Sequence, residues 1–158
     1  MRLLVVAVVL AMSWSTSAVA QVEKIGAWTL GQVQDEMTDA VTVTAIVSAG
    51  VDSVGLVCDP KRKGWRGVLM AHQPFLGEGS RVVAYRMDDD PAVAIVAPYG
   101  QQGAMLYQND TAVFLQRLST AQRLRVRLFD YNTVAFNSDF DVTGAGQVMA
   151  RMAELCDQ

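Results

Sequence analysis

The stretch RLRVRLFDYNTVAFNSDFD, residues 123–141, decides the fold class because charged and apolar side chains alternate through its first half. Alternation with a period of two predicts a strand with one polar and one apolar face. If residues 131–133 form a three-residue loop, with Asn132 or Thr133 in the left-handed conformation, Asp130 pairs with Val134. The stretch is therefore predicted to be a β-hairpin.

The predicted register also decides which side chains meet across the hairpin. On the inner face it pairs Leu128 with Phe136, Val126 with Ser138 and Leu124 with Phe140. On the outer face it pairs Arg123 with Asp141, Arg125 with Asp139 and Arg127 with Asn137. Each opposite-charge pair contributes a few tenths to about 1 kcal/mol and helps to specify the register. One interpretation is a structural charge ladder, and the other is an anion-binding surface formed by the three arginines.

Strand-like segments with short turns also fill the chain before the hairpin. The predicted strands are residues 41–48, 54–58, 65–71, 81–87, 92–97 and 104–108. Two segments have the helical period instead, one capped by Asn109 or Asp110 and running to about Ala121, and one from about Ala145 to Leu155 with Thr143 as its cap. Their predicted inner faces are Val113, Phe114, Arg117, Leu118 and Ala121, then Val148, Met149, Met152, Leu155 and Cys156. The fold class is therefore α+β, mostly antiparallel β in a sandwich or a strongly bent sheet, with two helices, the second C-terminal.

Residues 1–20 have the features of a cleavable signal peptide. Arg2 precedes a ten-residue apolar run, and small residues lead to a cleavage site after Ala20. A retained membrane helix is the alternative, but the apolar run is shorter than the roughly 20 residues that span a bilayer. We expect residues 21–158 to form a single secreted β-rich domain, periplasmic or extracellular and soluble after cleavage.

The chain has two cysteines, Cys58 and Cys156, far apart in sequence. Export to an oxidising compartment favours a disulfide between them. A bridge that closes so long a loop contributes roughly 4 to 5 kcal/mol in the chain-entropy model. The alternative, a catalytic thiol, would need a neighbouring base, for which His72 is the one histidine available.

Composition and motifs argue against several function classes. The formal net charge is −3, and loss of Arg2 with the leader leaves 12 basic and 16 acidic residues, a net charge of −4. Nucleic-acid binders usually carry a strongly basic face instead. A single histidine excludes multi-histidine zinc sites. The run Asp88–Asp90 lacks the ligand spacing of an EF-hand and reads as a solvated turn. With no recognisable catalytic motif, we expect a non-enzymatic protein without metal or cofactor.

A basic cluster around Trp65 is a candidate interaction surface. It consists of Lys61, Arg62, Lys63, Trp65 and Arg66. It reads either as a hairpin tip or as a contact for an acidic partner or an anionic envelope polymer.

Several short segments together resemble the VasI/TagO family of type VI secretion-associated proteins. They are Gly26-Ala27-Trp28, Leu56-Val57-Cys58, Arg86-Met87-Asp88 and residues 140–152 followed by Cys156. The resemblance implies an exported, non-enzymatic accessory protein that contacts components of a secretion machine in the envelope, with Trp28, Arg86 and Asp88 as recurring positions. The chain departs from longer relatives, which carry a further cysteine-containing region before the tryptophan. A secreted inhibitor or ligand-binding domain, acting on a cell-wall enzyme or envelope polymer, is the alternative.

Overall fold

A computed structural model describes residues 22–60, 62–73, 76–100 and 103–156. These residues form one ten-stranded sheet and two helices. The strands are β1 (Val22–Ile25), β2 (Trp28–Gln34), β3 (Val41–Ala49), β4 (Asp52–Asp59), β5 (Arg62–Ala71), β6 (Gly79–Met87), β7 (Val93–Gly100), β8 (Gly103–Leu106), β9 (Arg123–Phe129) and β10 (Ala135–Asp141). The helices are α1 (Gln108–Leu118) and α2 (Ala145–Cys156).

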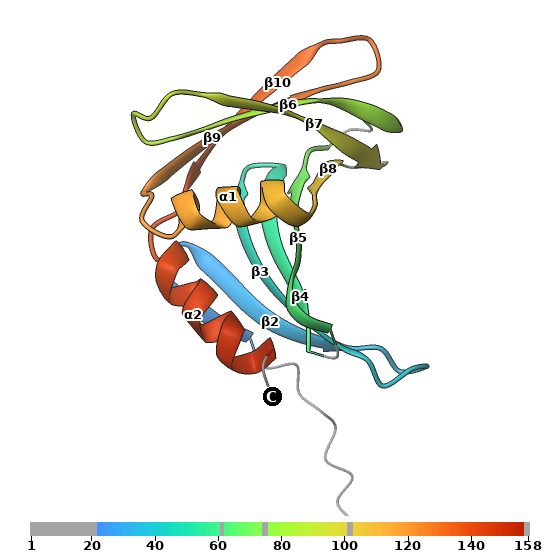
Figure 1. The fold of residues 1–158 in the computed structure, drawn as a ribbon, viewed down its shortest axis with the longest axis vertical. Helices are drawn as coiled ribbons and strands as arrows, with labels where there is room; N and C mark the ends of the chain where they lie inside the picture. Colours follow the sequence, from blue (N-terminus) through green and yellow to red (C-terminus); the bar gives the residue numbers. More distant parts are fainter. Residues whose placement is uncertain (1–21, 61, 74–75, 101–102, 157–158) are drawn as a thin grey trace, which may run out of the picture.

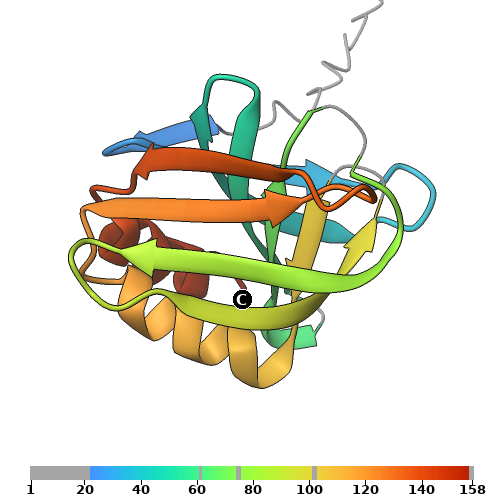
Figure 2. The same cartoon turned by 90° about the horizontal axis from the view of Figure 1, so that it is seen from above.

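The sheet is antiparallel throughout and bends strongly, as the sequence predicted. Its strand order is β1-β2-β3-β4-β5-β8-β7-β6-β9-β10. Figure 1 shows that the sheet turns over near β8, so that β6, β7, β9 and β10 face the half formed by β1 to β5. In Figure 2 the strands β10, β9, β6 and β7 form the nearer layer, in that order. Helix α1 lies along the open side between the halves, and α2 packs against β2 and β3.

The core lies between the two halves and under both helices. Trp28 of β2, Phe114 of α1 and Phe140 of β10 are completely or almost completely buried. The rings of Tyr85 and Phe114 meet edge to face with centroids 5.0 Å apart. Burial of large aromatic side chains contributes strongly to stability, so the core ties the helices to both halves of the sheet.

The sequence did not predict the hairpin formed by β1 and β2. Gly26, with φ of +58°, forms the turn between these strands against the backbone at Thr143. The Ala27 N–H donates to the Thr143 carbonyl at 3.2 Å, and Trp28 Nε1 donates to the Val142 carbonyl at 3.2 Å. The hairpin is therefore held by the connection between β10 and α2, which is distant in sequence.

Helix α1 differs from its prediction at its start and in its buried face. It begins at Gln108, and the N-cap position is Tyr107, without a side-chain cap, so the predicted cap at Asn109 or Asp110 is wrong. Val113, predicted to face inward, is 51% exposed. The buried stripe is Thr111, Phe114, Leu115 and Leu118. These positions follow the i, i+3, i+4, i+7 spacing of one helix face, which leaves Val113 on the side facing solvent.

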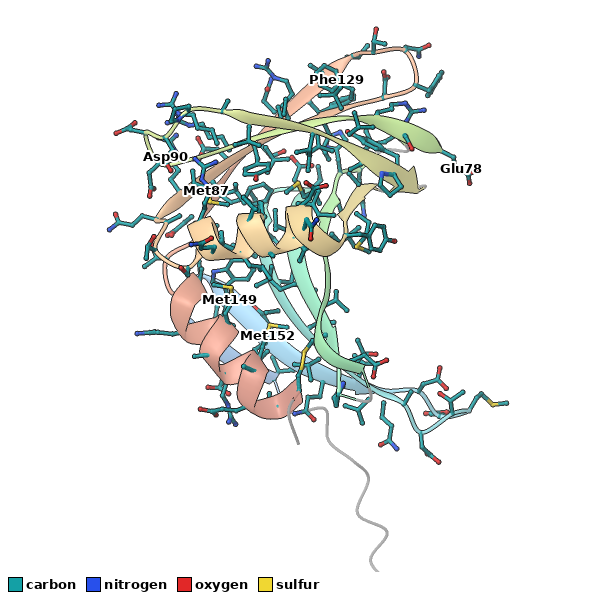
Figure 3. All side chains as sticks on the ribbon, viewed as in Figure 1. Glu78, Met87, Asp90, Phe129, Met149 and Met152 are labelled. Carbon is teal, nitrogen blue, oxygen red and sulfur yellow. A yellow bond between two sulfur atoms is a disulfide. The ribbon has the colours of Figure 1, made fainter. Side chains whose placement is uncertain are left out.

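Helix α2 has the predicted inner face but a different cap. Val148, Met152 and Cys156 are buried, and Met149 and Leu155 pack partly against the core; Figure 3 labels Met149 and Met152 on this helix. The Gly144 carbonyl accepts the Val148 N–H at 2.9 Å. Gly144 therefore takes the capping position expected for Thr143.

The disulfide between Cys58 and Cys156 is confirmed. It joins β4 to the last turn of α2, with the two Cα atoms 6.4 Å apart, and Figure 3 shows it beside the end of the helix. Both residues are buried. Because both sulfur atoms are bonded, the alternative of a catalytic thiol is excluded in this state of the protein.

Candidate functional site

The hairpin of β9 and β10 has the register that the sequence predicted. Leu128 lies opposite Phe136, and every other predicted pair is also present. The Asp130 N–H donates to the Val134 carbonyl at 3.0 Å, and Thr133 takes the left-handed conformation with φ of +65°. The outer face of the hairpin therefore carries the arginine stripe.

The closer ion pair of Asp139 is diagonal, with Arg123, while the predicted pair straight across, with Arg125, is present but longer. Arg123 donates hydrogen bonds from two nitrogens to the Asp139 carboxylate, and its Nε lies 2.6 Å from Oδ1. Arg125 Nε is 3.6 Å from Asp139 Oδ2. Asp141, the expected partner of Arg123, accepts the Thr143 N–H at 2.9 Å instead. A single carboxylate is thus shared by two guanidinium groups.

The titration of Asp139 reflects this sharing. Hydrogen bonding from Arg123 is the main cause that lowers the pKa of the Asp139 carboxyl, and the charges of Arg123 and Arg125 add to it. The same hydrogen bond raises the pKa of Arg123. The carboxylate is therefore ionised and largely neutralised by Arg123 at neutral pH.

The third arginine of the stripe meets a neutral side chain. Arg127 Nε donates to Asn137 Oδ1 at 2.7 Å, as the register predicted. An amide oxygen orients the guanidinium without cancelling its charge. The positive charge of Arg127 is therefore retained on this face.

Strand β6 adds a fourth arginine that sequence reasoning did not connect to the stripe. Arg86 lies directly opposite Arg125 in the β6–β9 register. Its Nη2 is 3.4 Å from Asp89 Oδ1, a fully exposed carboxylate. Its Nε is buried and has no hydrogen-bond partner among the residues that the structure describes. The signal in the sequence was the arginine in a predicted strand, but only the strand order shows that β6 neighbours β9.

A depression of about 350 Å³ lies on this face. Its lining includes Arg86 of β6, Arg125 and Arg127 of β9, and Asp139 of β10, with the small side chains of Ala84 and Ala92 beside them. We call it the arginine pocket. A second depression, of about 450 Å³, shares Arg125 and includes Asp88 and Asp89.

Asp88 holds the strand connections beside the pocket. With φ of +46°, it follows β6, and its carboxylate accepts the N–H groups of Gln122 and Arg123 at 3.1 and 2.8 Å. Its own N–H donates to the Arg123 carbonyl at 2.9 Å. This recurring position of the VasI/TagO resemblance therefore has a structural role here.

The acidic run at 88–90 is divided among different partners. Asp89 approaches Arg86, and Asp90 accepts a hydrogen bond from Arg117 Nη2 at 2.9 Å. Figure 3 labels Asp90 at the turn between β6 and β7. Across the described ranges, no three His, Cys, Asp or Glu side chains are grouped so that they could hold a metal ion.

A buried polar cluster joins the two halves of the sheet. Ser138 of β10 donates to one oxygen of Asp52, and His72 Nδ1 bonds to the other. His72 follows β5, as predicted for a strand-end residue, but it is only 8% exposed and stacks on Phe136 with ring centroids 4.2 Å apart. A Ser-His-Asp hydrolase needs its serine bonded to the histidine, whereas here Ser138 and His72 both bond to Asp52. The cluster therefore connects β10 to the opposite half of the sheet, and we call it the Ser138–Asp52–His72 clamp.

The side chains of the basic cluster around Trp65 fall outside the part of the chain that the structure describes. They are the side chains of Lys61, Arg62, Lys63, Trp65 and Arg66. The backbone from Arg62 belongs to β5, which pairs with β4 from the Asp59–Arg62 pair onward. This agrees with a position next to a hairpin tip.

Comparison of the chain with protein-family models, with curated proteins and with solved structures gave no match. None of the helices within the described ranges is long and apolar enough to cross a membrane. The function is therefore argued from the arginine pocket and from the sequence features that predict export.

Proposed function

We propose that this protein is an exported, non-enzymatic binding domain of the cell envelope that acts by contact with a protein partner. The observation that carries the proposal is the arginine pocket, where three guanidinium groups from adjacent strands meet on one open face. Rigid strands are well suited to hold such groups in a fixed arrangement. The contact would therefore be made by the outer face of β6, β9 and β10.

Export is supported by the leader and the disulfide together. Residues 1–20 have the layout of a cleavable signal peptide. The Cys58–Cys156 bridge is the kind of bond that persists in oxidising compartments and is rare in the cytosol. Both features point to the periplasm or the cell exterior.

The non-enzymatic part of the proposal is supported by the chemistry of the polar clusters. Ser138 donates to Asp52 rather than to His72, so the described histidine has no serine nucleophile bonded to it. Cys58 and Cys156 are consumed by their disulfide. Ser138 and the two cysteines thus have structural partners.

The VasI/TagO resemblance suggests which partner to look for. It implies an accessory module that contacts other components of a type VI secretion system in the envelope. The alternative is an inhibitor that docks on a cell-wall enzyme or an envelope polymer.

A crosslinked pull-down tests the proposal. The exported protein, with its disulfide intact, is used as bait in an envelope extract of the source organism, and captured proteins are identified by mass spectrometry. Sheath, baseplate or membrane-complex proteins would support the secretion-accessory function. Capture of a single cell-wall hydrolase that the protein inhibits stoichiometrically would favour the inhibitor function instead. Capture of no envelope protein would contradict both functions.

The mass of the exported protein tests whether the leader is cleaved after Ala20.

A further inference from the structure

We infer that the arginine pocket binds the carboxylates of a short acidic segment of a partner protein. The inference rests on the proposed function, because it names the chemistry of the contact through which the domain would act.

A like-charge pair lines the pocket. Arg86 lies directly opposite Arg125 in the β6–β9 register. Like charges directly opposite each other destabilise a sheet, so this pair does not serve the fold. An anion between the two guanidinium groups would convert the repulsion into attraction.

The neighbouring carboxylates also leave guanidinium donors unused. Asp139 accepts its hydrogen bonds from Arg123, while Arg125 Nε lies 3.6 Å from Asp139 Oδ2. The contact from Arg86 to Asp89 is 3.4 Å long and fully exposed on the aspartate side, and such pairs contribute little. Arg86 Nε is also unpartnered within the described part of the chain. The face therefore carries more guanidinium donors than its own carboxylates use.

The spacing of the arginines along β9 also fits an extended peptide. Arg125 and Arg127 are two residues apart on β9 and project from the same face, so their Cα atoms are about 6.5 to 7 Å apart. Alternate carboxylates of an extended peptide have the same spacing. A guanidinium group binds a planar carboxylate through two parallel hydrogen bonds. The amide nitrogen of Asn137, whose oxygen is taken by Arg127, offers a further donor beside them.

The size of the pocket limits what it can bind. The pocket is open on the outer face and has a volume of about 350 Å³, near the lower end of small-ligand sites. Such a depression accommodates side chains presented by another surface better than it encloses a free molecule.

A long polyanion fits the molecule less well. Binding of polyanions depends on a broad basic field, whereas this chain has a net charge of −3. Asp88 and Asp89 line the adjoining depression and would repel an extended polyphosphate. A short acidic segment needs only the local cluster of arginines.

Binding of a defined peptide tests the inference. The probe is a fluorescein-labelled peptide of alternating serine and glutamate, titrated with the exported, oxidised protein at about 20 mM salt and followed by fluorescence anisotropy. We expect saturable binding that weakens about fivefold to tenfold in R86Q/R125Q, in proportion to two exposed charge pairs. R127Q should weaken binding as a single variant. R151Q is the matched control, because Arg151 lies on α2 and pairs with Glu23 of β1 and with Glu154 of α2.

The comparisons are made only between variants with wild-type circular dichroism and melting temperature. Equal affinity of R151Q, R127Q and R86Q/R125Q would overturn the inference. So would equal binding of a peptide in which glutamine replaces glutamate, or preferential binding of polyphosphate.

The envelope pull-down separates this inference from the proposed function. Loss of the captured partner in R86Q/R125Q but not in R151Q supports both. Capture of the same partner by all variants overturns the arginine pocket as the contact and leaves the binding function standing. Capture by none, including the wild type, overturns the proposed function, while the peptide titration still decides the chemistry of the pocket.

Discussion

At the residue scale, single carboxylates hold the outer face together. Asp88 binds two backbone N–H groups at the start of β9, and Asp139 links two arginines of the same strand. Asp88 contacts β9 from the end of β6, and Asp139 contacts it from β10, so the two residues act from the two strands that flank β9. The placement of the arginine pocket thus depends on residues that are themselves exposed.

Replacing Asp88 separates its hydrogen bonds from its backbone conformation. Asp88→Gly keeps the positive φ accessible but removes the acceptor for the Gln122 and Arg123 N–H groups. We expect the free energy of unfolding to fall by about 1 kcal/mol in urea titrations. Asp88→Asn retains an acceptor oxygen and tolerates the left-handed region, so it should lose much less. Equal losses in the two variants would contradict the role assigned to the carboxylate.

Asp139 should give the protein a pH-dependent contribution to stability. Its pKa in the folded protein is lowered, chiefly by Arg123, relative to an unfolded value of about 4. The contribution is therefore fully present above pH 4 and is lost as the pH falls through the folded pKa. Because the side chain is 43% exposed, we expect only a few tenths to about 1 kcal/mol.

The measurement compares wild type and Asp139→Asn by urea unfolding between about pH 7 and pH 2. The difference in unfolding free energy should shrink towards acid pH and in about 1 M salt, which screens exposed charges. A difference that is independent of pH would contradict the ion pair.

At the scale of elements, the hairpin of β9 and β10 carries its register in its own sequence. Alternating Leu and Arg side chains, the Asp130–Val134 closure and a three-residue loop all specify one pairing. The hairpin of β1 and β2 lacks such information. It depends on Trp28 and Ala27 bonding to the start of the α2 connection. The β9–β10 hairpin is therefore specified by its own residues, whereas the β1–β2 hairpin depends on contacts with a segment distant in sequence.

Thr133 is the strained residue of the β9–β10 loop. A β-branched residue is unfavourable at its φ of +65°, and glycine accepts this conformation without steric cost. We expect Thr133→Gly to raise the free energy of unfolding by about 0.5 to 1 kcal/mol. Thermal or urea unfolding measures the change.

The control for Thr133 is a threonine in an exposed turn with an ordinary φ. Thr120→Gly adds backbone entropy to the unfolded chain without relieving strain, so it should lower stability slightly. If both glycine variants were destabilised to the same degree, loop strain would not account for Thr133.

At the scale of the whole molecule, three kinds of contact connect segments that are distant in sequence. The disulfide ties β4 to α2, the Ser138–Asp52–His72 clamp joins β10 to the opposite half of the sheet, and Trp28 anchors β2 beneath the α2 connection. Together with the core they hold the bent sheet closed over both helices.

Removing the disulfide should destabilise the whole fold. The bridge closes a loop with a sequence separation of 98, and loss of such a bridge costs about 2 to 5 kcal/mol. We expect Cys58→Ala/Cys156→Ala to shift the urea midpoint downward by the corresponding amount. The reducing agent dithiothreitol should destabilise the wild type and leave the double variant unchanged. An unchanged midpoint in the double variant would contradict the stabilising role.

Sequence patterns alone were enough to predict the β-rich class, both helices, the disulfide and the register of the β9–β10 hairpin. These features follow from short-range periodicity or from the presence of only two cysteines. Sequence patterns failed at the start of α1 and at the β1–β2 hairpin, since Tyr107 has no side-chain cap and Trp28 is held by Val142. The position of β6 beside β9, which brings Arg86 opposite Arg125, was visible only in the folded chain. The physical reason is that strand order depends on how the bent sheet closes around one core, which no local pattern encodes.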